Sequence, residues 1–480
     1  MKDKIAILGA GASGLGTYLG LVKKGFKNID IYNSNFKNNI KLRNIEIDKN
    51  TNVNNKIKNY YSILKSLKNY GILNRKSYRG TYLDEIIISK KSVIYDSNIE
   101  YGLTNFWGGV LQTFDDDYIK RNHILKNLEN IDDIYNELSS IIPITSNGSS
   151  NSFLNLISNR KKIDTYDLNN QLNLFLNDKN GVNNSISSIA LDTKKINFET
   201  ECLCIIGACP IHSIFSTENY FYSNKIKVLN DEIIGIDLDK SEIIFLNDRK
   251  KYDKIFVNLG PFNSQKILLK SINKDSAEKI LVKDSSSFMF PIFFSGRINS
   301  NKSKNFFNLT NNIVNFKNDD NKTVTLQIYP PTRHILRTFL PTFAFSISSH
   351  LTDILLNRVL WAKCYLPEGT EKEKFFSTKE EGILENSNRK KIQQNQKYIF
   401  NKLSSILKKS DFFPINISIN GKTSSHYSGC NNVLLDILNK DTSEISKNII
   451  LSDSTSWNSV PSQSPTFTIM ANAMNISYKI

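Results

Sequence analysis

The chain has 480 residues, 40% of them hydrophobic and 11% aromatic, which suits a large packed core and is too long for one simple domain. Its net charge of +16 comes from scattered lysines, without a dense basic block or interleaved aromatic and arginine residues, so we expect no nucleic-acid partner. Five cysteines argue against a disulfide framework, and no run reaches about 18 apolar residues, so we expect a cytoplasmic chain without a transmembrane segment, with peripheral membrane contact left open.

The first elements are predicted to be a strand, a glycine turn, a helix and a second strand. Residues 5–8 are an apolar run, typical of a parallel strand that is buried on both faces. A G-x-G-x-x-G sequence follows, formed by Gly9, Gly11 and Gly14, with Ser13 inside it. Such glycines permit a tight turn, close approach of backbone to a pyrophosphate, and close packing of the next helix. The pattern therefore predicts a dinucleotide site.

Two alternatives to this site are an ordinary glycine loop and a signal peptide. Asp3, the glycine spacing and the lack of a small-residue cleavage site argue against the signal peptide. Asn33 stands where an acidic residue is expected to bind the ribose hydroxyls. Asparagine can still bind a ribose, but it excludes a 2′-phosphate less strongly. FAD, NAD and NADP are not distinguished by this stretch.

The next 160 or so residues alternate between polar stretches and predicted elements. We expect an exposed excursion over 33–60, a helix over 60–69, a strand over 83–89, helices over 115–138, and an irregular stretch over 144–198. Asn105-Phe-Trp107-Gly108-Gly109 places a glycine pair after a large aromatic residue, which lets backbone pass close to a flat group.

Cys202, Cys204 and Cys209 form the cysteine cluster of the sequence. Their spacing does not match the usual iron–sulfur pattern, and a fourth ligand would have to come from Cys364 or Cys430. We interpret the cluster as a buried loop of small cysteines and predict no metal site.

The middle of the chain repeats the first pattern and then changes. Strands are expected over 225–230, 232–238 and 254–259, the last ending in Gly260 and followed by a helix through 269, which implies that this segment rejoins the first sheet. In 285–424 we expect strands over 288–294 and 324–329, an aromatic-rich run over 339–345, and helices over 351–361 and 390–407.

The last 55 or so residues contain two motifs. The first is His426-Tyr-Ser-Gly429. The second runs from Asp453 to Pro465 and Thr466, with Ser464 predicted as the N-cap and Pro465 as the first residue of a helix that runs to 480. That helix directs the positive end of its dipole at whatever lies before it.

Taken together, these motifs resemble those of the glucose-methanol-choline (GMC) oxidoreductase superfamily, FAD enzymes that oxidise alcohols and sugars. The resemblance rests on the glycine fingerprint, the Asn105–Gly109 stretch and the two C-terminal motifs, which are similar to H-x-x-G-T and D-A-S…P…N-P-T. The aromatic–glycine form and the cysteine–proline segment look most like divergent bacterial members found with polysaccharide or glycan biosynthesis.

The resemblance implies an α/β fold in which a Rossmann-like FAD-binding domain is interleaved with a mixed-sheet substrate domain. The FAD-binding parts would be 1–143, 199–284 and 425–480, the substrate domain 285–424, and 144–198 an irregular excursion or an insertion of the substrate domain.

The resemblance also assigns roles to single residues. His426 would be the general base, and Ser464 stands where the family has a second catalytic histidine or asparagine. The positions that would bind FAD are Gly9, Gly11, Ser13, Gly14, Asn33, Asn105, Trp107, Gly108, Gly109, Val228, Gly260, Asp453, Pro465 and Thr466. Among these, Asn33 would meet the ribose, Trp107 to Gly109 the isoalloxazine, backbone near Val228 the adenine, Asp453 the pyrophosphate or ribityl chain, and Thr466 the pyrimidine end.

The expected activity is that of an FAD-dependent dehydrogenase that oxidises a hydroxyl of a sugar, glycan precursor or other alcohol. The substrate is a small molecule, and an anionic or lipid-linked one stays open, as does the electron acceptor. Two alternatives are kept. Asn33, Ser464 and Cys430 depart from the family pattern, which favours a flavin-binding protein that has lost catalysis. An NADP-dependent Rossmann enzyme would explain the N-terminus and leave the C-terminal motifs without a role.

Overall fold

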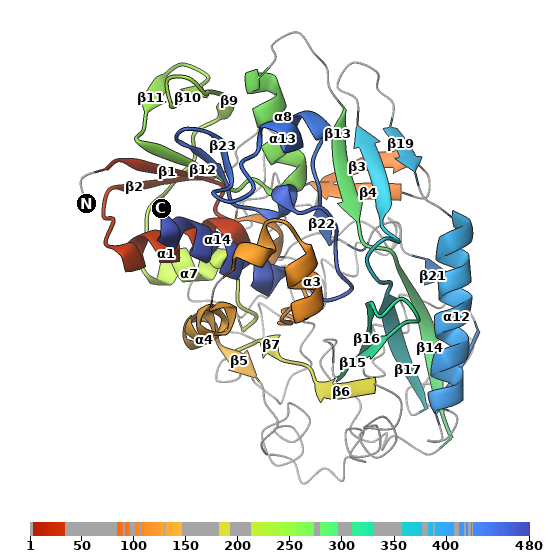
Figure 1. Cartoon of the computed structure of the whole chain (residues 1–480). Coiled ribbons are helices and arrows are strands. Elements are labelled where there is room, and N and C mark those ends of the chain that lie inside the picture. Colours follow the sequence, from red (N-terminus) through yellow and green to blue (C-terminus); the bar gives the residue numbers. More distant parts are fainter. Residues whose placement is uncertain are drawn as a thin grey trace, which may run out of the picture.

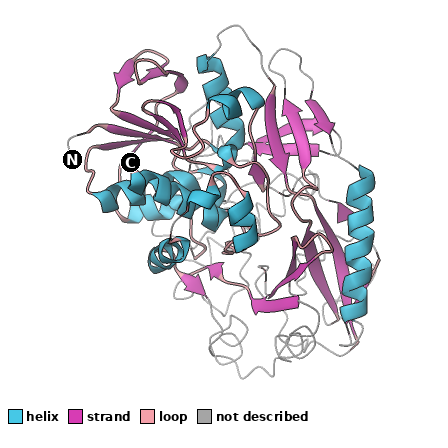
Figure 2. Cartoon of the chain, in the orientation of Figure 1, coloured by secondary structure: helices cyan, strands magenta, loops and turns pink. Residues whose placement is uncertain are grey.

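The fold is seen in a computed structural model, in which helices and sheets alternate (Figures 1 and 2). It describes residues 3–33, 84–89, 92–96, 101–105, 107–128, 130–145, 182–192, 213–272, 279–295, 310, 312–329, 358–376, 383–386, 389–407, 412–416, 419–420, 424 and 426–480. The helix expected over 60–69, the run 339–345 and Cys202, Cys204 and Cys209 lie outside the described residues.

A largely parallel sheet gathers strands from both ends and the middle of the chain. Its order is β23-β24-β12-β1-β2-β8, and only the edge strand β23 is antiparallel to its neighbour. The strands are β1 (Ile5–Leu8), β2 (Ile29–Tyr32), β8 (Val228–Leu229), β12 (Lys254–Val257), β23 (Glu444–Ser446) and β24 (Ile449–Leu451). The prediction that the middle segment rejoins the first sheet is thus confirmed, because β12 pairs with β1.

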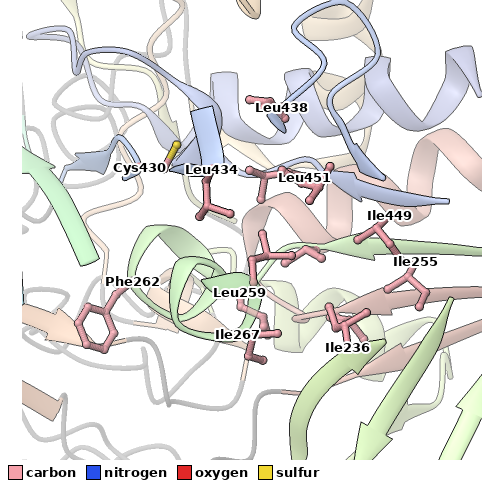
Figure 3. Close-up of a cluster of buried hydrophobic side chains, with 14 of the residues drawn as sticks. Ile236, Ile255, Leu259, Phe262, Ile267, Cys430, Leu434, Leu438, Ile449 and Leu451 are labelled. Atoms are coloured by element: carbon pink, nitrogen blue, oxygen red, sulfur yellow. The ribbon is translucent and has the colours of Figure 1, made fainter. Parts of the chain in front are cut away.

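Both faces of this sheet are covered, as the unbroken apolar run of β1 predicts. On one face, α8 (Gly260–Ile272) and α13 (Asn432–Ile437) cover side chains such as Ile255, Ile449 and Leu451 (Figure 3). On the other face, α1 (Ala12–Lys24) and α14 (Thr466–Lys479) cover a core that includes Ile5, Ile7 and Phe256. Helix α1 ends at Gly25, whose φ of 97° is the left-handed conformation expected of such a cap.

A second sheet supplies the other large layer of the molecule. Its order is β20-β14-β17-β16-β15-β6, with β21 also paired to β14. The strands are β6 (Val182–Ile186), β14 (Ser287–Phe294), β15 (Asn312–Lys317), β16 (Thr323–Tyr329), β17 (Val359–Tyr365), β20 (Phe412–Pro414) and β21 (Ile419–Asn420). On β14 to β17 the even-numbered residues form an apolar core against α12 (Arg389–Leu407), which lies along the outside of the sheet in Figure 1.

The helix predicted over 351–361 is wrong at its C-terminal end. Residues from Val359 onward form β17, a central strand between β14 and β16. The strand forms because neighbouring strands pair with it. The run Val359–Tyr365 is apolar enough for either element, and pairing on both sides decides for the strand.

Smaller elements join the two layers. A four-stranded sheet has the order β19-β18-β13-β22, formed by β13 (Ile280–Asp284), β18 (Lys372–Phe376), β19 (Ile383–Asn386) and β22 (Tyr427–Ser428). The others are β3 (Asp84–Ser89), β4 (Ser92–Asp96), η2 (Gly102–Asn105), α3 (Asp116–Arg121), η3 (Leu125–Asn127), α4 (Ile131–Ile141), β5 (Ile144–Thr145), β7 (Ile189–Ala190), α7 (Thr217–Ser223), β9 (Ile233–Asp237), β10 (Glu242–Phe245), β11 (Arg249–Lys251) and η7 (Ser454–Ser456). Among the described residues, no helix has the length and apolar character needed to cross a membrane.

Two glycines that the motif does not contain set the contact between α1 and α14. A Cβ added at Gly16 would lie 2.2 Å from the Met470 carbonyl oxygen, and one at Gly20 would lie 2.4 Å from that of Met474. We predict that Gly16→Ala destabilises the chain by about 1–3 kcal/mol, because backbone cannot yield as a side chain does. Denaturant unfolding measures this. Gly235→Ala is the control, since its Cβ would meet nothing closer than 3.8 Å, and equal losses in both variants would contradict the prediction.

Candidate functional site

The three fingerprint glycines are needed for different reasons. Gly9 has a φ of +106°, and its Cβ would lie 2.3 Å from the Asn258 carbonyl oxygen. A Cβ at Gly14 would lie 1.9 Å from the Gly9 carbonyl oxygen. At Gly11 the nearest protein atom, Gly102 Cα, would be 3.7 Å away, an ordinary contact. The protein itself therefore excludes side chains at Gly9 and Gly14, and it leaves space for one at Gly11.

The start of α1 has the character of an anion site. Gly11 is its N-cap and offers no side-chain cap, and the first turn carries no acidic residue. The Ser13 hydroxyl donates to the Asn258 carbonyl oxygen at 3.4 Å, on the side of β12. Uncapped N–H groups at a helix start attract negative charge. These features fit a phosphate group at Gly11.

Asn33 lies buried at the end of β2 with part of its amide unused. Its backbone N–H donates to the Leu229 carbonyl oxygen at 2.8 Å, and its Oδ1 accepts from the Tyr101 N–H at 3.1 Å. Among the described residues, Nδ2 has no hydrogen-bond partner. Val228, the position expected near the adenine, lies on the strand beside β2, where it pairs in register with Ile31. A buried donor without an acceptor is costly, so Asn33 fits a ligand hydroxyl or ether oxygen here.

The aromatic–glycine stretch is anchored on both sides of Gly108. Asn105 Nδ2 donates to Glu218 Oε2 at 3.3 Å, and Trp107 Nε1 donates to the Phe215 carbonyl oxygen at 2.7 Å. Gly109 has a φ of +68°, and a Cβ there would lie 3.1 Å from the Ile189 side chain. Gly108 is exposed, and its Cβ would meet no protein atom within 4 Å. The fixed backbone thus presents one open glycine.

Asp453 is fully engaged by its own chain. Its Oδ2 accepts from the Gly260 N–H at 2.8 Å and from the Ser264 hydroxyl at 2.6 Å, and its Oδ1 accepts from the Thr455 N–H at 2.9 Å. Burial raises the pKa of this carboxyl group, although these hydrogen bonds oppose the shift. Asp453 therefore links the start of α8 to η7. The cofactor contact expected of it stays a prediction.

The last helix begins one residue later than predicted. Thr466 is its first residue and Pro465 its N-cap, because the Pro465 carbonyl oxygen accepts the first helical hydrogen bond from Ile469. Ser464 does not cap the helix. Its hydroxyl oxygen accepts from Gln327 Nε2 at 3.0 Å, and its N–H donates to Gln112 Oε1 at 3.0 Å. The first turn of α14 has neither a side-chain cap nor an acidic residue, so it too suits negative charge.

His426 lies against the second sheet. Its ring stacks on Tyr365 of β17 with the ring centroids 4.6 Å apart and the planes 8° apart. Lys363 Nζ lies 4.6 Å from the centroid of the same tyrosine ring. Burial, reinforced by the charge of Lys363, lowers the pKa of His426 to about 3. Nδ1 has no hydrogen-bond partner in the part of the chain that the structure describes. The imidazole is thus neutral at pH 7.

One sheet face brings His426 and Ser464 to the same region. Tyr365 pairs with Thr325, and Lys363 pairs with Gln327, so all four side chains lie on the face opposite the α12 core. His426 stacks on Tyr365, and Ser464 accepts from Gln327. Sequence reasoning missed these sheet residues. Their signal is the alternation along Thr325-Leu-Gln327-Ile, in which polar odd positions follow apolar even ones.

The two described cysteines lie in separate apolar cores. Cys364 belongs to the core under α12, and Cys430 to the core shown in Figure 3. Burial raises the pKa of both thiols. Within the described ranges, no group of three or more histidine, cysteine, aspartate or glutamate side chains could hold a metal ion.

The lowered pKa of His426 predicts a pH-dependent stability. Between its folded pKa of about 3 and the unfolded value of about 6.5, the unfolded chain binds more protons, so stability falls as pH falls through this window. We expect the stability of the wild type relative to His426→Gln to drop by up to about 2 kcal/mol from about pH 7.5 to about pH 5. Urea unfolding at both pH values measures it. A difference that does not change with pH would contradict the assignment.

Comparison with known proteins gives a likeness of structure. No family model and no curated protein matches the sequence. Pyridoxine 4-oxidase from Mesorbium loti has a TM-score of 0.58 at 8% identity, covering 100% of this chain and 99% of its own. Formate oxidase from Aspergillus oryzae RIB40, studied for the modification of its FAD, has a TM-score of 0.54 at 9% identity, covering 99% and 97%. At such identities the likeness concerns the fold. The chain therefore has, over its whole length, the fold of these two oxidases, which confirms the predicted α/β class with a Rossmann-like sheet interleaved with mixed sheets.

Proposed function

We propose that this chain is an FAD-dependent oxidoreductase that oxidises a hydroxyl group of a sugar, glycan precursor or other alcohol, with His426 as the base. Support comes from the fold shared with two oxidases, one of which carries FAD, and from the site itself. The observation that carries the proposal is a histidine whose Nδ1 has no hydrogen-bond partner among the described residues, on the same sheet face as the contacts of Ser464.

The residues present fit FAD. The uncapped start of α1 and the space at Gly11 would hold the pyrophosphate, and Asn33 Nδ2 would donate to the ribose. The open Gly108 would let backbone pass beside the isoalloxazine, and the uncapped start of α14 at Thr466 would stabilise negative charge on its pyrimidine end. When bound, FAD would supply the hydride acceptor.

The chain's own residues would handle the proton. The neutral His426 would accept the proton of the alcohol while the C–H bond breaks. Because the Ser464 hydroxyl oxygen already accepts from Gln327, its hydrogen is oriented away from Gln327 and can be donated to the substrate oxygen. Burial of His426 against Tyr365 excludes water from one side of the base.

A flavin-binding protein without catalysis is the second candidate, and Ser464 in place of a second catalytic histidine or asparagine favours it. A serine hydroxyl can orient an alcohol but does not take up a proton near neutral pH. An NADP-dependent Rossmann enzyme has less support, because the structural likeness to the two oxidases spans the C-terminal motifs as well as the N-terminus.

The first experiment tests the cofactor through the glycine turn. We predict that the purified chain shows absorption bands near roughly 370 and 450 nm, typical of oxidised flavin. Gly11→Ala should lower the bound flavin at least about tenfold with little loss of apoprotein stability, because a Cβ there meets protein only at 3.7 Å. Gly14→Ala should instead destabilise the apoprotein, since its Cβ would lie 1.9 Å from a carbonyl oxygen. A colourless chain, even after reconstitution with FAD, would refute the proposal.

The second experiment tests the reaction. Anaerobic addition of a panel of sugars and alcohols should bleach the flavin with one class of substrate, and His426→Ala should slow that reduction by about a hundredfold or more. Ser405→Ala is the control, since this exposed hydroxyl lies on α12, outside the candidate site, and donates to the Lys402 carbonyl oxygen. Reoxidation by oxygen and by an artificial dye then compares oxidase with dehydrogenase. Flavin that no substrate bleaches would favour the non-catalytic candidate.

A further inference from the structure

A fully buried ion pair lies beneath the segment that carries His426. Lys374 Nζ donates to Asp284 Oδ2 at 2.7 Å, and both side chains are 0% exposed. Asp284 ends β13, and Lys374 lies on the neighbouring strand β18.

The carboxylate of this pair holds the chain two residues before His426. Asp284 Oδ1 accepts from the Ser424 N–H at 3.1 Å and from the Ser424 hydroxyl at 2.6 Å. The Ser424 hydroxyl oxygen in turn accepts from the His426 N–H at 3.2 Å. A continuous series of hydrogen bonds therefore runs from Lys374 through Asp284 and Ser424 to the backbone of His426.

The other side of His426 is fixed by the same strand. The Ser285 N–H donates to the His426 carbonyl oxygen at 3.1 Å. Tyr427, the next residue, pairs in register with Asp284 where β22 joins β13. The backbone of His426 is thus held before and after its Cα, and its ring meets Tyr365 of the second sheet.

Stability alone gives little reason for such a pair. Two charges lose their hydration on burial, and replacing both with apolar residues of similar size is often neutral or stabilising. A carboxylate, however, can accept from the N–H and hydroxyl of one residue and from an ammonium group at once. Asp284 uses this capacity, since it accepts from Ser424 and from Lys374 together.

We propose that Asp284, with its charge balanced by Lys374, is a positioning residue that sets the orientation of His426 through Ser424. The inference rests on the role proposed above for His426 as the base. It predicts that loss of the acceptor for Ser424, rather than loss of the charges, releases the histidine.

Two matched double variants separate these effects. Asp284→Asn with Lys374→Met removes both charges and keeps an oxygen that accepts from Ser424. Asp284→Leu with Lys374→Met removes the charges and the acceptor together. Single variants are avoided because each removes one half of a buried ion pair and leaves the other charge without this partner.

The readout is the ring of His426 in the full chain as purified. The chain has five histidines, so labelling with 13C at the ring carbon Cε1 gives five signals, and the signal lost in His426→Gln assigns His426. We expect the Asn/Met variant to keep the wild-type shift and titration. The Leu/Met variant should raise the pKa of His426 by about one unit or more toward about 6.5. Equal behaviour of the two variants would overturn the inference.

If the Leu/Met variant does not fold, single hydroxyl deletions decide the question. Ser424→Ala removes the group that links Asp284 to the His426 N–H, and it should move the His426 signal. Ser428→Ala removes a neighbouring hydroxyl and should not move it. Matching spectra for these two variants would overturn the inference.

Flavin reduction gives an independent readout. With the substrate found by the panel, the Leu/Met variant should lose about 10- to 100-fold in rate, and the Asn/Met variant should stay within about threefold of the wild type. The histidine signals do not depend on flavin. A chain that binds no flavin would therefore refute the proposed function, while the signals would still decide whether Asp284 orients His426.

Discussion

Three segments that are far apart in the sequence meet at Asn258, at the carboxyl end of β12. Its carbonyl oxygen would lie 2.3 Å from a Cβ on Gly9, and it accepts from the Ser13 hydroxyl. Its side-chain Oδ1 accepts from the Ser452 hydroxyl at 2.7 Å and from the Thr17 hydroxyl at 3.3 Å. The glycine turn, the end of the middle strand β12 and the residue before the C-terminal motif thus share one polar contact.

A second buried amide, that of Gln265, connects α8 to the segment that follows His426. Gln265 of α8 donates through Nε2 to the carbonyl oxygens of Leu281 and Gly429, and its Oε1 accepts from the N–H groups of Leu281 and Asn431. It therefore ties the helix after β12 to β13 and to the loop that follows His426. A fully satisfied buried amide fixes one arrangement of backbone, because the alternatives leave polar groups unpaired.

The surroundings of His426 keep its imidazole uncharged. The Tyr365 ring stacks on His426, and burial together with the charge of Lys363 disfavours the imidazolium form. The carboxylate of Asp284 forms an ion pair with Lys374 and accepts from the Ser424 hydroxyl.

The sequence by itself determined the local features of the fold. An unbroken apolar run, three glycines at fixed spacing and a glycine helix stop specify β1, the turn and α1, because each depends on only a few neighbouring residues. The return of the middle segment to the first sheet followed from a second strand and glycine turn. The resemblance also indicated His426 and Ser464, whose proposed roles await measurement.

Only the tertiary structure decided what surrounds these residues. Residues 359–361 form a strand because β14 pairs with all three and β16 pairs with Trp361. Ser464 contacts Gln327 instead of capping α14 because the second sheet reaches it. Asp284 and Lys374 are 90 residues apart, and nothing local marks them as partners. Such contacts depend on how distant strands pair, which short-range patterns do not encode.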